Sequence, residues 1–121
     1  MATSYDLQGV RVFVCAPEGK KLRSGRDAID LIAEAHAADL ILVPVERFDG
    51  DFFRLRSGLA GEFIQKFVTY GRRLAILGDI SRHVAESAAL RDFVHEANRG
   101  EHFWFVANLQ ELNKRIRPPS L

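Results

Sequence analysis

The sequence feature that most constrains the fold is a helix pattern that leads directly into a short apolar strand pattern, within residues 49–79. The apolar side chains of this helix share one face and are Leu59, Ala60, Phe63, Ile64, Phe67 and Val68. Gly71 stands where a helix needs a residue in the left-handed conformation, and residues 74–77 form the continuous apolar run typical of a buried strand. A helix that leads into a buried strand is half of a crossover unit, so this stretch predicts a parallel or mixed sheet covered by helices.

Further strands and helices are predicted on both sides of this stretch. Apolar runs rich in β-branched or aromatic residues predict strands at residues 10–15, 40–43 and 102–106, and a weaker strand at 4–7. Ser24 and Asp27 have the spacing of a capping box and predict a helix start, followed by a buried stripe of Ala28, Leu31, Ile32 and Ala35. A later helix should start between residues 81 and 87 and end at 98–100, and Asn108 with Glu111 should cap a last one.

The alternation of strands and helices predicts the fold class. We expect an α/β fold with a single layer of four to five mostly parallel or mixed strands, covered by about four helices. The hydrophobic content of 47% in 121 residues suffices for one core, so a single domain is expected over residues 4–117, followed by a proline-containing tail at 118–121. Ligands of such sheets bind beyond the carboxyl ends of the strands, which here are residues 15–17, 43–45, 78–81 and 107–108.

Residues 45–56 form the least regular segment and carry four large apolar side chains, Phe48, Phe52, Phe53 and Leu55. They predict a loop that packs on the core or contains a short helical turn. Phe48, Phe52 and Phe53 are also candidates for an exposed interaction surface, which would favour a partner protein or a homodimer.

Composition excludes several classes of protein. Seventeen basic and sixteen acidic residues give a net charge of +1, which disfavours nucleic acid as a partner. The N-terminus lacks the pattern of a secretion signal, and no run approaches the ~20 apolar residues of a membrane-spanning helix, so a soluble, cytoplasmic protein is expected. The single Cys15 cannot form an intrachain disulfide and shares no metal-ligand spacing with the histidines, so neither a metal nor another cofactor is predicted.

Two short motifs are candidates for a site. Ser57 and Gly58 stand at the expected start of the central helix, where free N–H groups and the helix dipole favour an anion, and Arg54 and Arg56 are beside them. Ser57 is therefore either part of an anion site, with a hydroxyl that can be phosphorylated, or only a helix cap.

The second motif, Asp79 with Ser81, follows a predicted strand at its carboxyl end. Its carboxylate is either a ligand contact or the acceptor of a local turn. Nothing in the spacing of the nucleophilic and titratable residues defines a catalytic set.

Five segments of the chain resemble a family of bacterial proteins known as domain of unknown function DUF4180. They are residues 55–62 (LRSGLAGE), 63–67 (FIQKF), 74–79 (LAILGD), 90–93 (LRDF) and 97–100 (ANRG). This resemblance implies no activity. The layout is more distantly similar to STAS domains, the fold of sulfate-transporter and anti-sigma-factor-antagonist proteins. Ser57, Gly58 and Leu59 match the S-G-L of the STAS turn, whose serine is the phosphorylated switch of the antagonist proteins.

Two hypotheses for the function follow. The first is a non-enzymatic, STAS-like regulatory or interaction domain that meets a protein partner or an anion through residues 49–61. The second is a small enzyme or nucleotide- or anion-binding protein that uses Arg54, Arg56, Ser57 and Asp79. An enzyme should gather titratable groups in a concave pocket, whereas an interaction domain should show a flat patch that includes the phenylalanines.

Overall fold

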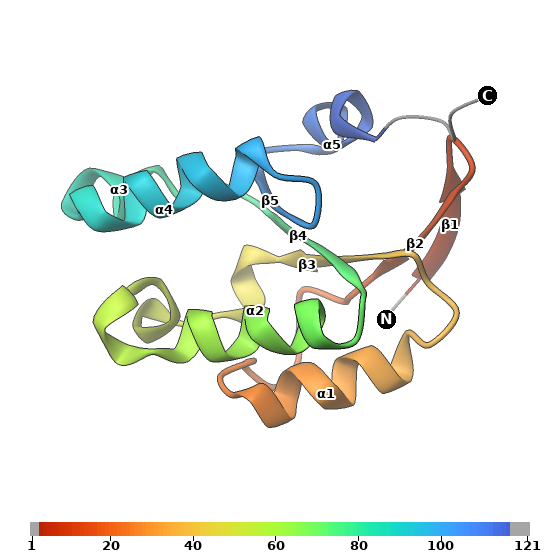
Figure 1. Cartoon of the computed structure of the whole chain (residues 1–121), viewed down its shortest axis with the longest axis horizontal. Helices are drawn as coiled ribbons and strands as arrows, with labels where there is room; N and C mark the ends of the chain where they lie inside the picture. Colours follow the sequence, from red (N-terminus) through yellow and green to blue (C-terminus); the bar gives the residue numbers. More distant parts are fainter. Residues whose placement is uncertain (1–2, 117–121) are drawn as a thin grey trace.

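The computed structural model describes residues 3–116, so the tail predicted at 118–121 lies outside the described residues. Five strands form one sheet in chain order, β1 (Thr3–Leu7), β2 (Val10–Val14), β3 (Leu40–Pro44), β4 (Arg73–Leu77) and β5 (Phe103–Val106). Strand β1 is antiparallel to β2, and the other neighbouring pairs are parallel. The helices are α1 (Gly25–Glu34), α2 (Leu59–Thr69), α3 (Ser81–Glu86), α4 (Ala88–Arg99) and α5 (Leu109–Arg115). This arrangement confirms the predicted α/β class (Figure 1).

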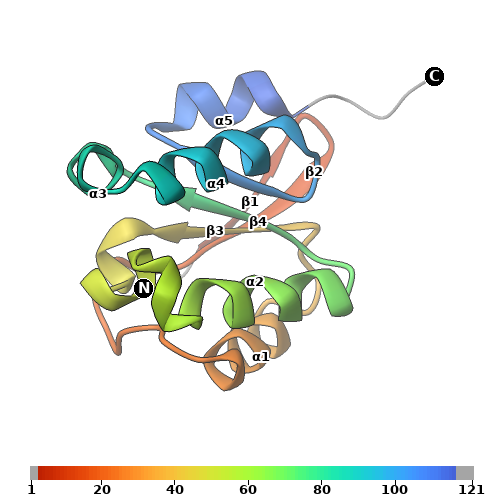
Figure 2. The same ribbon diagram turned by 60° about the vertical axis from the view of Figure 1, so that its left-hand side comes forward.

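The two faces of the sheet are covered unequally. Because the parallel strands follow the chain order, crossovers of one hand place every connecting helix on the same face. That face buries Ile41, Leu74 and Phe105 with side chains of α1, α2 and α4, whereas the opposite face buries Leu42 and Trp104 with side chains of α5. Helices α1 and α2 lie side by side, as Figures 1 and 2 show.

Helix α2 confirms the central pattern with one correction. Ala60, Phe63 and Phe67 are buried, but Val68 is 56% exposed. Val68 lies about 100° round the helix from Phe67, beyond the strip that the sheet and α1 can cover. The helix ends at Thr69, and Gly71 just beyond its C-cap has the predicted left-handed conformation, with a φ of 66°. The N–H of Arg72 donates to the carbonyl oxygen of Phe67 at 2.9 Å, which completes a Schellman end.

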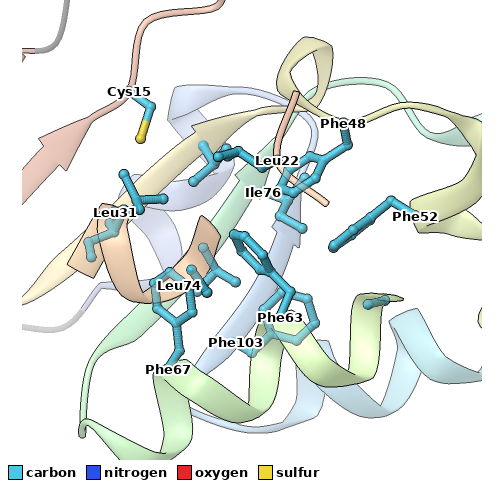
Figure 3. Close-up of a cluster of buried hydrophobic side chains, with 14 of the residues drawn as sticks. Cys15, Leu22, Leu31, Phe48, Phe52, Phe63, Phe67, Leu74, Ile76 and Phe103 are labelled. Carbon is cyan, nitrogen blue, oxygen red and sulfur yellow. The ribbon is translucent and has the colours of Figure 1, made fainter. Parts of the chain in front are cut away.

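The loop between β3 and α2 folds into three short 3-10 turns, Val45–Arg47, Gly50–Phe53 and Leu55–Ser57. Phe48, Phe52 and Phe53 are only 4%, 1% and 5% exposed. The rings of Phe48 and Phe52 are stacked 4.1 Å apart, and both meet Phe63 edge-on (Figure 3). The prediction that this loop packs on the core is therefore confirmed.

The prediction that Phe48, Phe52 and Phe53 form an exposed interaction surface is wrong. Folding buries these rings against α2, because that position removes their apolar surface from water within the same chain. A homodimer stays a prediction, now without these side chains as its basis.

One weakly predicted element is confirmed, and one expected helix is divided. The weak strand at 4–7 is real, because it forms a hairpin with β2 through Gln8 and Gly9, whose φ angles of 52° and 86° are typical of a two-residue hairpin turn. The single helix expected before residue 98 is two helices. They separate at Ser87, whose hydroxyl accepts from the Leu90 N–H at 3.1 Å and caps α4.

Candidate functional site

The loops after β3 and β4 meet at the carboxyl edge of the sheet. Pro44 and Leu77 are paired in the parallel register, so both loops leave the sheet at the same level. Gly78 has a φ of 143°, and a Cβ added there would clash with the side chain of Val45. The glycine therefore lets the two loops run against each other, at the position where ligands of parallel sheets bind.

A ring contact joins the two loops. The rings of Phe53 and His83 are stacked with centroids 4.4 Å apart and an angle of 15° between their planes. Phe53 belongs to the loop after β3, and His83 belongs to α3. This contact fixes the relative positions of the residues next to each ring, which include Arg54 and Arg82.

These two segments enclose an open hollow of about 860 Å³, which we call the Arg82 hollow. It is lined by Gly50, Phe53, Arg54, Leu55, Arg56, Arg82, His83, Glu86, Ser87 and Ala89. Arg54 pairs with Asp51 at 3.3 Å, but within residues 3–116 the side chains of Arg56 and Arg82 have no ion-pair or hydrogen-bond partner. Because Ser87 and Ala89 form the start of α4, the hollow also meets a helix N-terminus, where N–H groups lack intrahelical acceptors.

Ser57 and Gly58 lie beside this hollow and outside its lining. The Ser57 Oγ is within hydrogen-bond distance of the carbonyl oxygens of Arg54 (2.8 Å) and Asp51 (2.9 Å), and it accepts from the Leu59 N–H at 3.2 Å. Gly58, with a φ of 79°, precedes the first residue of α2. The N-cap of α2 is Gly58, and Ser57 contacts the first N–H of the helix from one position before that cap, with its side chain exposed. Both interpretations of Ser57, a local structural contact and an anion or phosphorylation site, stay predictions.

Asp79 and Ser81 form a turn at the start of α3. The Ser81 N–H donates to the Asp79 Oδ1 at 2.9 Å. Hydrogen bonds from the hydroxyl and the N–H of Ser81 lower the pKa of the Asp79 carboxyl below its ordinary value. Asp79 does not line the Arg82 hollow, so the structure brings Arg54 and Arg56 together with Arg82 and leaves Asp79 in the neighbouring turn.

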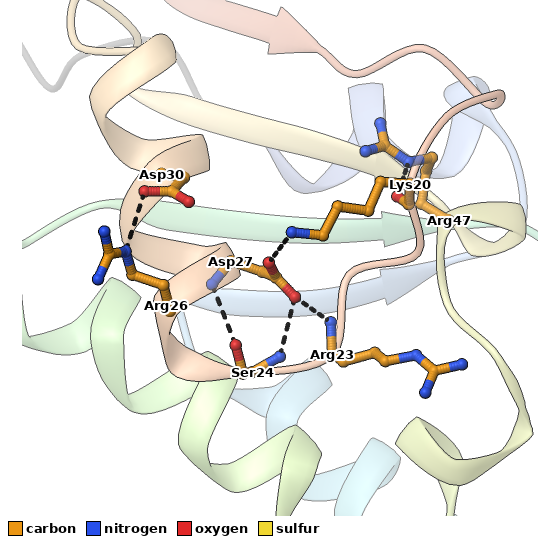
Figure 4. Close-up of polar contacts among 7 residues, drawn as sticks. All are labelled: Lys20, Arg23, Ser24, Arg26, Asp27, Asp30 and Arg47. Carbon is orange, nitrogen blue, oxygen red and sulfur yellow. Dashed lines mark hydrogen bonds and ion pairs between the residues drawn. The ribbon is translucent and has the colours of Figure 1, made fainter.

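The carboxyl end of β2 carries a second polar arrangement that the sequence revealed only in part. Ser24 and Asp27 form the predicted capping box, and Lys20 Nζ lies 3.0 Å from the Asp27 Oδ1 (Figure 4). A hollow of about 340 Å³ has Lys20, Asp27 and Cys15 in its lining. Burial raises the pKa of the Cys15 thiol to about 12, against an opposing effect of Arg47, so this thiol stays protonated and is a weak nucleophile.

Two further observations concern metal ions and membranes. Within residues 3–116, no group of three or more His, Cys, Asp or Glu side chains is placed to hold a metal ion. None of the helices in that range has the length and apolar composition needed to cross a membrane.

Arg82 and His83 were missed as site residues by the sequence analysis. They follow Ser81, which the sequence did single out, but no local pattern shows that α3 folds back onto Phe53. The ring contact between Phe53 and His83 exists only in the folded chain.

Fold and site together define a single-layer α/β domain with a cationic hollow at the carboxyl edge of its sheet. Residues 7–116 match the model of the family described as Domain of unknown function (DUF4180), and the chain belongs to that family. The family expected from the sequence is therefore confirmed. No curated protein and no solved structure matches the chain.

Proposed function

We propose that this protein is a non-enzymatic regulatory domain that binds an anion of the phosphate type in the Arg82 hollow. One observation carries this proposal: Arg54, Arg56 and Arg82 line one open hollow that also contains the N-terminus of α4. Guanidinium groups form paired hydrogen bonds with phosphate or carboxylate oxygens. A helix N-terminus adds N–H donors and a favourable dipole.

The charges of the hollow support an anion more than a cation. Its lining includes one carboxylate, Glu86, against the three arginines. Asp51 balances part of the charge of Arg54 from outside the lining. The volume of about 860 Å³ falls in the range typical of small-molecule sites.

The choice between a binding domain and an enzyme rests on the side chains that could transfer protons. His83 and Glu86 are the titratable candidates in the lining, and His83 is stacked on Phe53. We assign His83 a positioning role, because its ring holds α3 against the loop that carries Arg54 and Arg56. The concave shape favours the anion-binding part of the second hypothesis over a flat surface for a protein partner.

Calorimetric titration with inorganic phosphate tests the proposal. Arg82→Gln and Arg56→Gln should each weaken binding by about tenfold, which is roughly 1.4 kcal/mol for a lost charge-assisted contact. Both variants should fold, since neither side chain has a partner within residues 3–116. Arg26→Gln is the matched control, because Arg26 is exposed on α1 and pairs there with Asp30.

Two results would overturn the anion site. One is the absence of phosphate binding to the wild-type chain. The other is equal affinity of the wild type, both hollow variants and the Arg26 control.

A STAS-like switch at Ser57 is the second candidate function. Its support is that the S-G-L segment follows the third strand and opens α2, with the Ser57 side chain exposed beside Arg56. Phosphate at that position would bring about −2 charge to the edge of the Arg82 hollow. The phosphorylated serine and a free anion would then compete for the same arginines, so the two candidate functions describe one regulated site. We expect the protein in the cytoplasm.

A further inference from the structure

A second cationic hollow lies at the opposite end of the sheet, where β4 and β5 begin. Its volume is about 520 Å³, and we call it the Trp104 hollow. Its permanent cations are supplied by three separate elements: Arg73 opens β4, Arg99 ends α4, and Lys114 and Arg115 end α5. Helices α4 and α5 are neighbours at the β5 edge of the sheet in both ribbon views (Figures 1 and 2).

Trp104 lies under two of these cations. The indole is 4% exposed, and its Nε1–H donates to the Gly100 carbonyl oxygen at 2.8 Å. The guanidinium carbons of Arg73 and Arg115 each lie 5.9 Å from the centre of the ring, within the range of a cation–π attraction. Arg115 is further held by its Nη1, which donates to the carbonyl oxygen of Asn98 at 2.7 Å. The Arg115 guanidinium is thus oriented before any ligand arrives, and the Arg73 guanidinium lies over the same ring.

Nearby carboxylates balance only part of this charge. Glu101 lines the hollow with the cations. Glu96 lies 3.4 Å from Arg99 and Glu111 lies 4.0 Å from Arg115, but neither of these glutamates is part of the lining. Within residues 3–116, Arg73 and Lys114 have no carboxylate partner.

The helix ends explain some of these cations and leave one unexplained. Arg99, Lys114 and Arg115 stand in the last turns of α4 and α5, where positive charge complements the helix dipole. Arg73 opens β4 and does not belong to the last turn of a helix. Arg115 also keeps a buried Nε that has no hydrogen-bond partner within residues 3–116.

We propose that the Trp104 hollow binds a small polyanion that carries several phosphate groups. Like charges held in a concave site raise the local concentration of anions, and guanidinium groups match phosphate oxygens in geometry. Cations from three elements suit a ligand with more than one phosphate. The Trp104 ring is almost fully buried under two guanidinium groups, so a nucleobase cannot stack on it and the polyphosphate itself is recognised.

The chain's own fluorescence tests this site. Trp104 is the single tryptophan, so its emission reports on this hollow and not on the Arg82 hollow. Titration of the full chain with inorganic tripolyphosphate should change the emission saturably. Orthophosphate should bind at least about tenfold more weakly than tripolyphosphate, because it reaches fewer cations.

Variants separate this site from the proposed function. Lys114→Gln and Arg73→Gln should each weaken tripolyphosphate binding by about tenfold. Lys114 is exposed, so its variant should fold even if Arg73→Gln does not. Arg82→Gln should leave the fluorescence titration unchanged, and this result would hold even if the Arg82 hollow bound nothing.

Three outcomes would overturn the inference. The first is no saturable change in Trp104 emission with tripolyphosphate. The second is a Lys114→Gln titration identical to the wild type. The third is tighter binding of single-stranded oligothymidylate than of tripolyphosphate, which would assign the surface to nucleic acid.

Discussion

The two cationic hollows lie at opposite ends of the parallel strands and differ in what supports their arginines. In the Arg82 hollow the cations belong to the loop after β3 and to α3, and buried phenylalanine rings hold that loop on the core. In the Trp104 hollow the cations belong to a strand start and to two helix ends, and hydrogen bonds to backbone carbonyl groups hold the key side chains. Apolar burial therefore supports one hollow, and polar contacts support the other.

This difference predicts how strongly a substitution near each hollow lowers stability and how far its effect spreads. Loss of a buried ring leaves a cavity and loosens a whole loop, so it should lower stability strongly and disturb the Arg82 hollow first. Loss of a single hydrogen bond in the Trp104 hollow should cost less and remain local.

The largest effect is expected for Phe52→Ala. Phe52 is 1% exposed and stacks on Phe48, so its removal should lower the free energy of unfolding by about 3–5 kcal/mol. Phosphate binding in the Arg82 hollow should weaken at temperatures where the chain is still folded, while tripolyphosphate binding near Trp104 persists. Urea denaturation with both titrations measures this. Val68→Ala, at a 56% exposed position, should change stability by no more than about 0.5 kcal/mol.

The contrast between the hollows would be lost if Phe52→Ala and Val68→Ala had equal stability. It would also be lost if Phe52→Ala weakened both titrations to the same degree.

A smaller effect is expected for Asn98→Ala at the other end of the sheet. The Asn98 Oδ1 accepts from the Phe105 N–H at 2.8 Å, and this donor is left unpaired in the variant. The free energy of unfolding should fall by about 1–3 kcal/mol, with a change in Trp104 emission. Asn98→Asp keeps an acceptor oxygen and is the control for stability. Unaltered stability of the alanine variant would show that polar contacts do not support this hollow.

Much of the fold was predictable because it depends on local periodicity. The stripe of Phe63 and Phe67, the left-handed Gly71 and the capping box of Ser24 and Asp27 all appear in the structure as expected. Each depends on residues within one helix or its ends. Val68 departs from this local periodicity, because its burial depends on how far neighbouring elements reach round α2.

The candidate sites were predictable only where the residues are close in the sequence. Arg54 and Arg56 stand two positions apart, and the structure does place both in one hollow. Arg73 and Arg115 meet over Trp104 only because β4, β5 and α5 pack together. The burial of Phe48, Phe52 and Phe53 likewise depends on α2. No local pattern distinguishes such rings from an exposed patch.

Ser57 offers a test of the Arg82 hollow with a smaller effect on stability. Ser57→Ala should lower the free energy of unfolding by about 1 kcal/mol, because the Oγ bonds to the Leu59 N–H and to nearby carbonyl groups are lost. Ser57→Asp retains an acceptor at the helix start and adds a negative charge beside Arg56. If Ser57 is a switch, the aspartate form should bind phosphate more weakly in calorimetry, while the Trp104 titration stays the same. Equal phosphate affinity of the wild type, the alanine form and the aspartate form would leave Ser57 as a cap alone.

The smallest effect concerns how stability at the carboxyl edge of the sheet, beside Asp27, changes with acid. The Asp27 carboxylate accepts from the Arg23 N–H at 2.8 Å and the Ser24 N–H at 3.2 Å, and it pairs with Lys20. Burial alone would raise the pKa of Asp27, but these hydrogen bonds and Lys20 outweigh it and hold the pKa below the ordinary value of 3.8.

A carboxyl whose pKa is lower in the folded chain stabilises the fold above the ordinary pKa and loses that contribution as the pH falls through the folded value. Asp27→Asn should therefore cost about 0.3–1 kcal/mol at neutral pH, and its stability should then fall less steeply than that of the wild type below pH 3.8. Asp30→Asn is the matched control on the same helix, because the Asp30 side chain is 64% exposed and its ion pair with Arg26 contributes little. Urea denaturation across this pH range measures the difference. If the free energy of unfolding fell equally steeply with pH in the wild type and in Asp27→Asn, the capping box would not make the carboxyl edge of the sheet sensitive to acid.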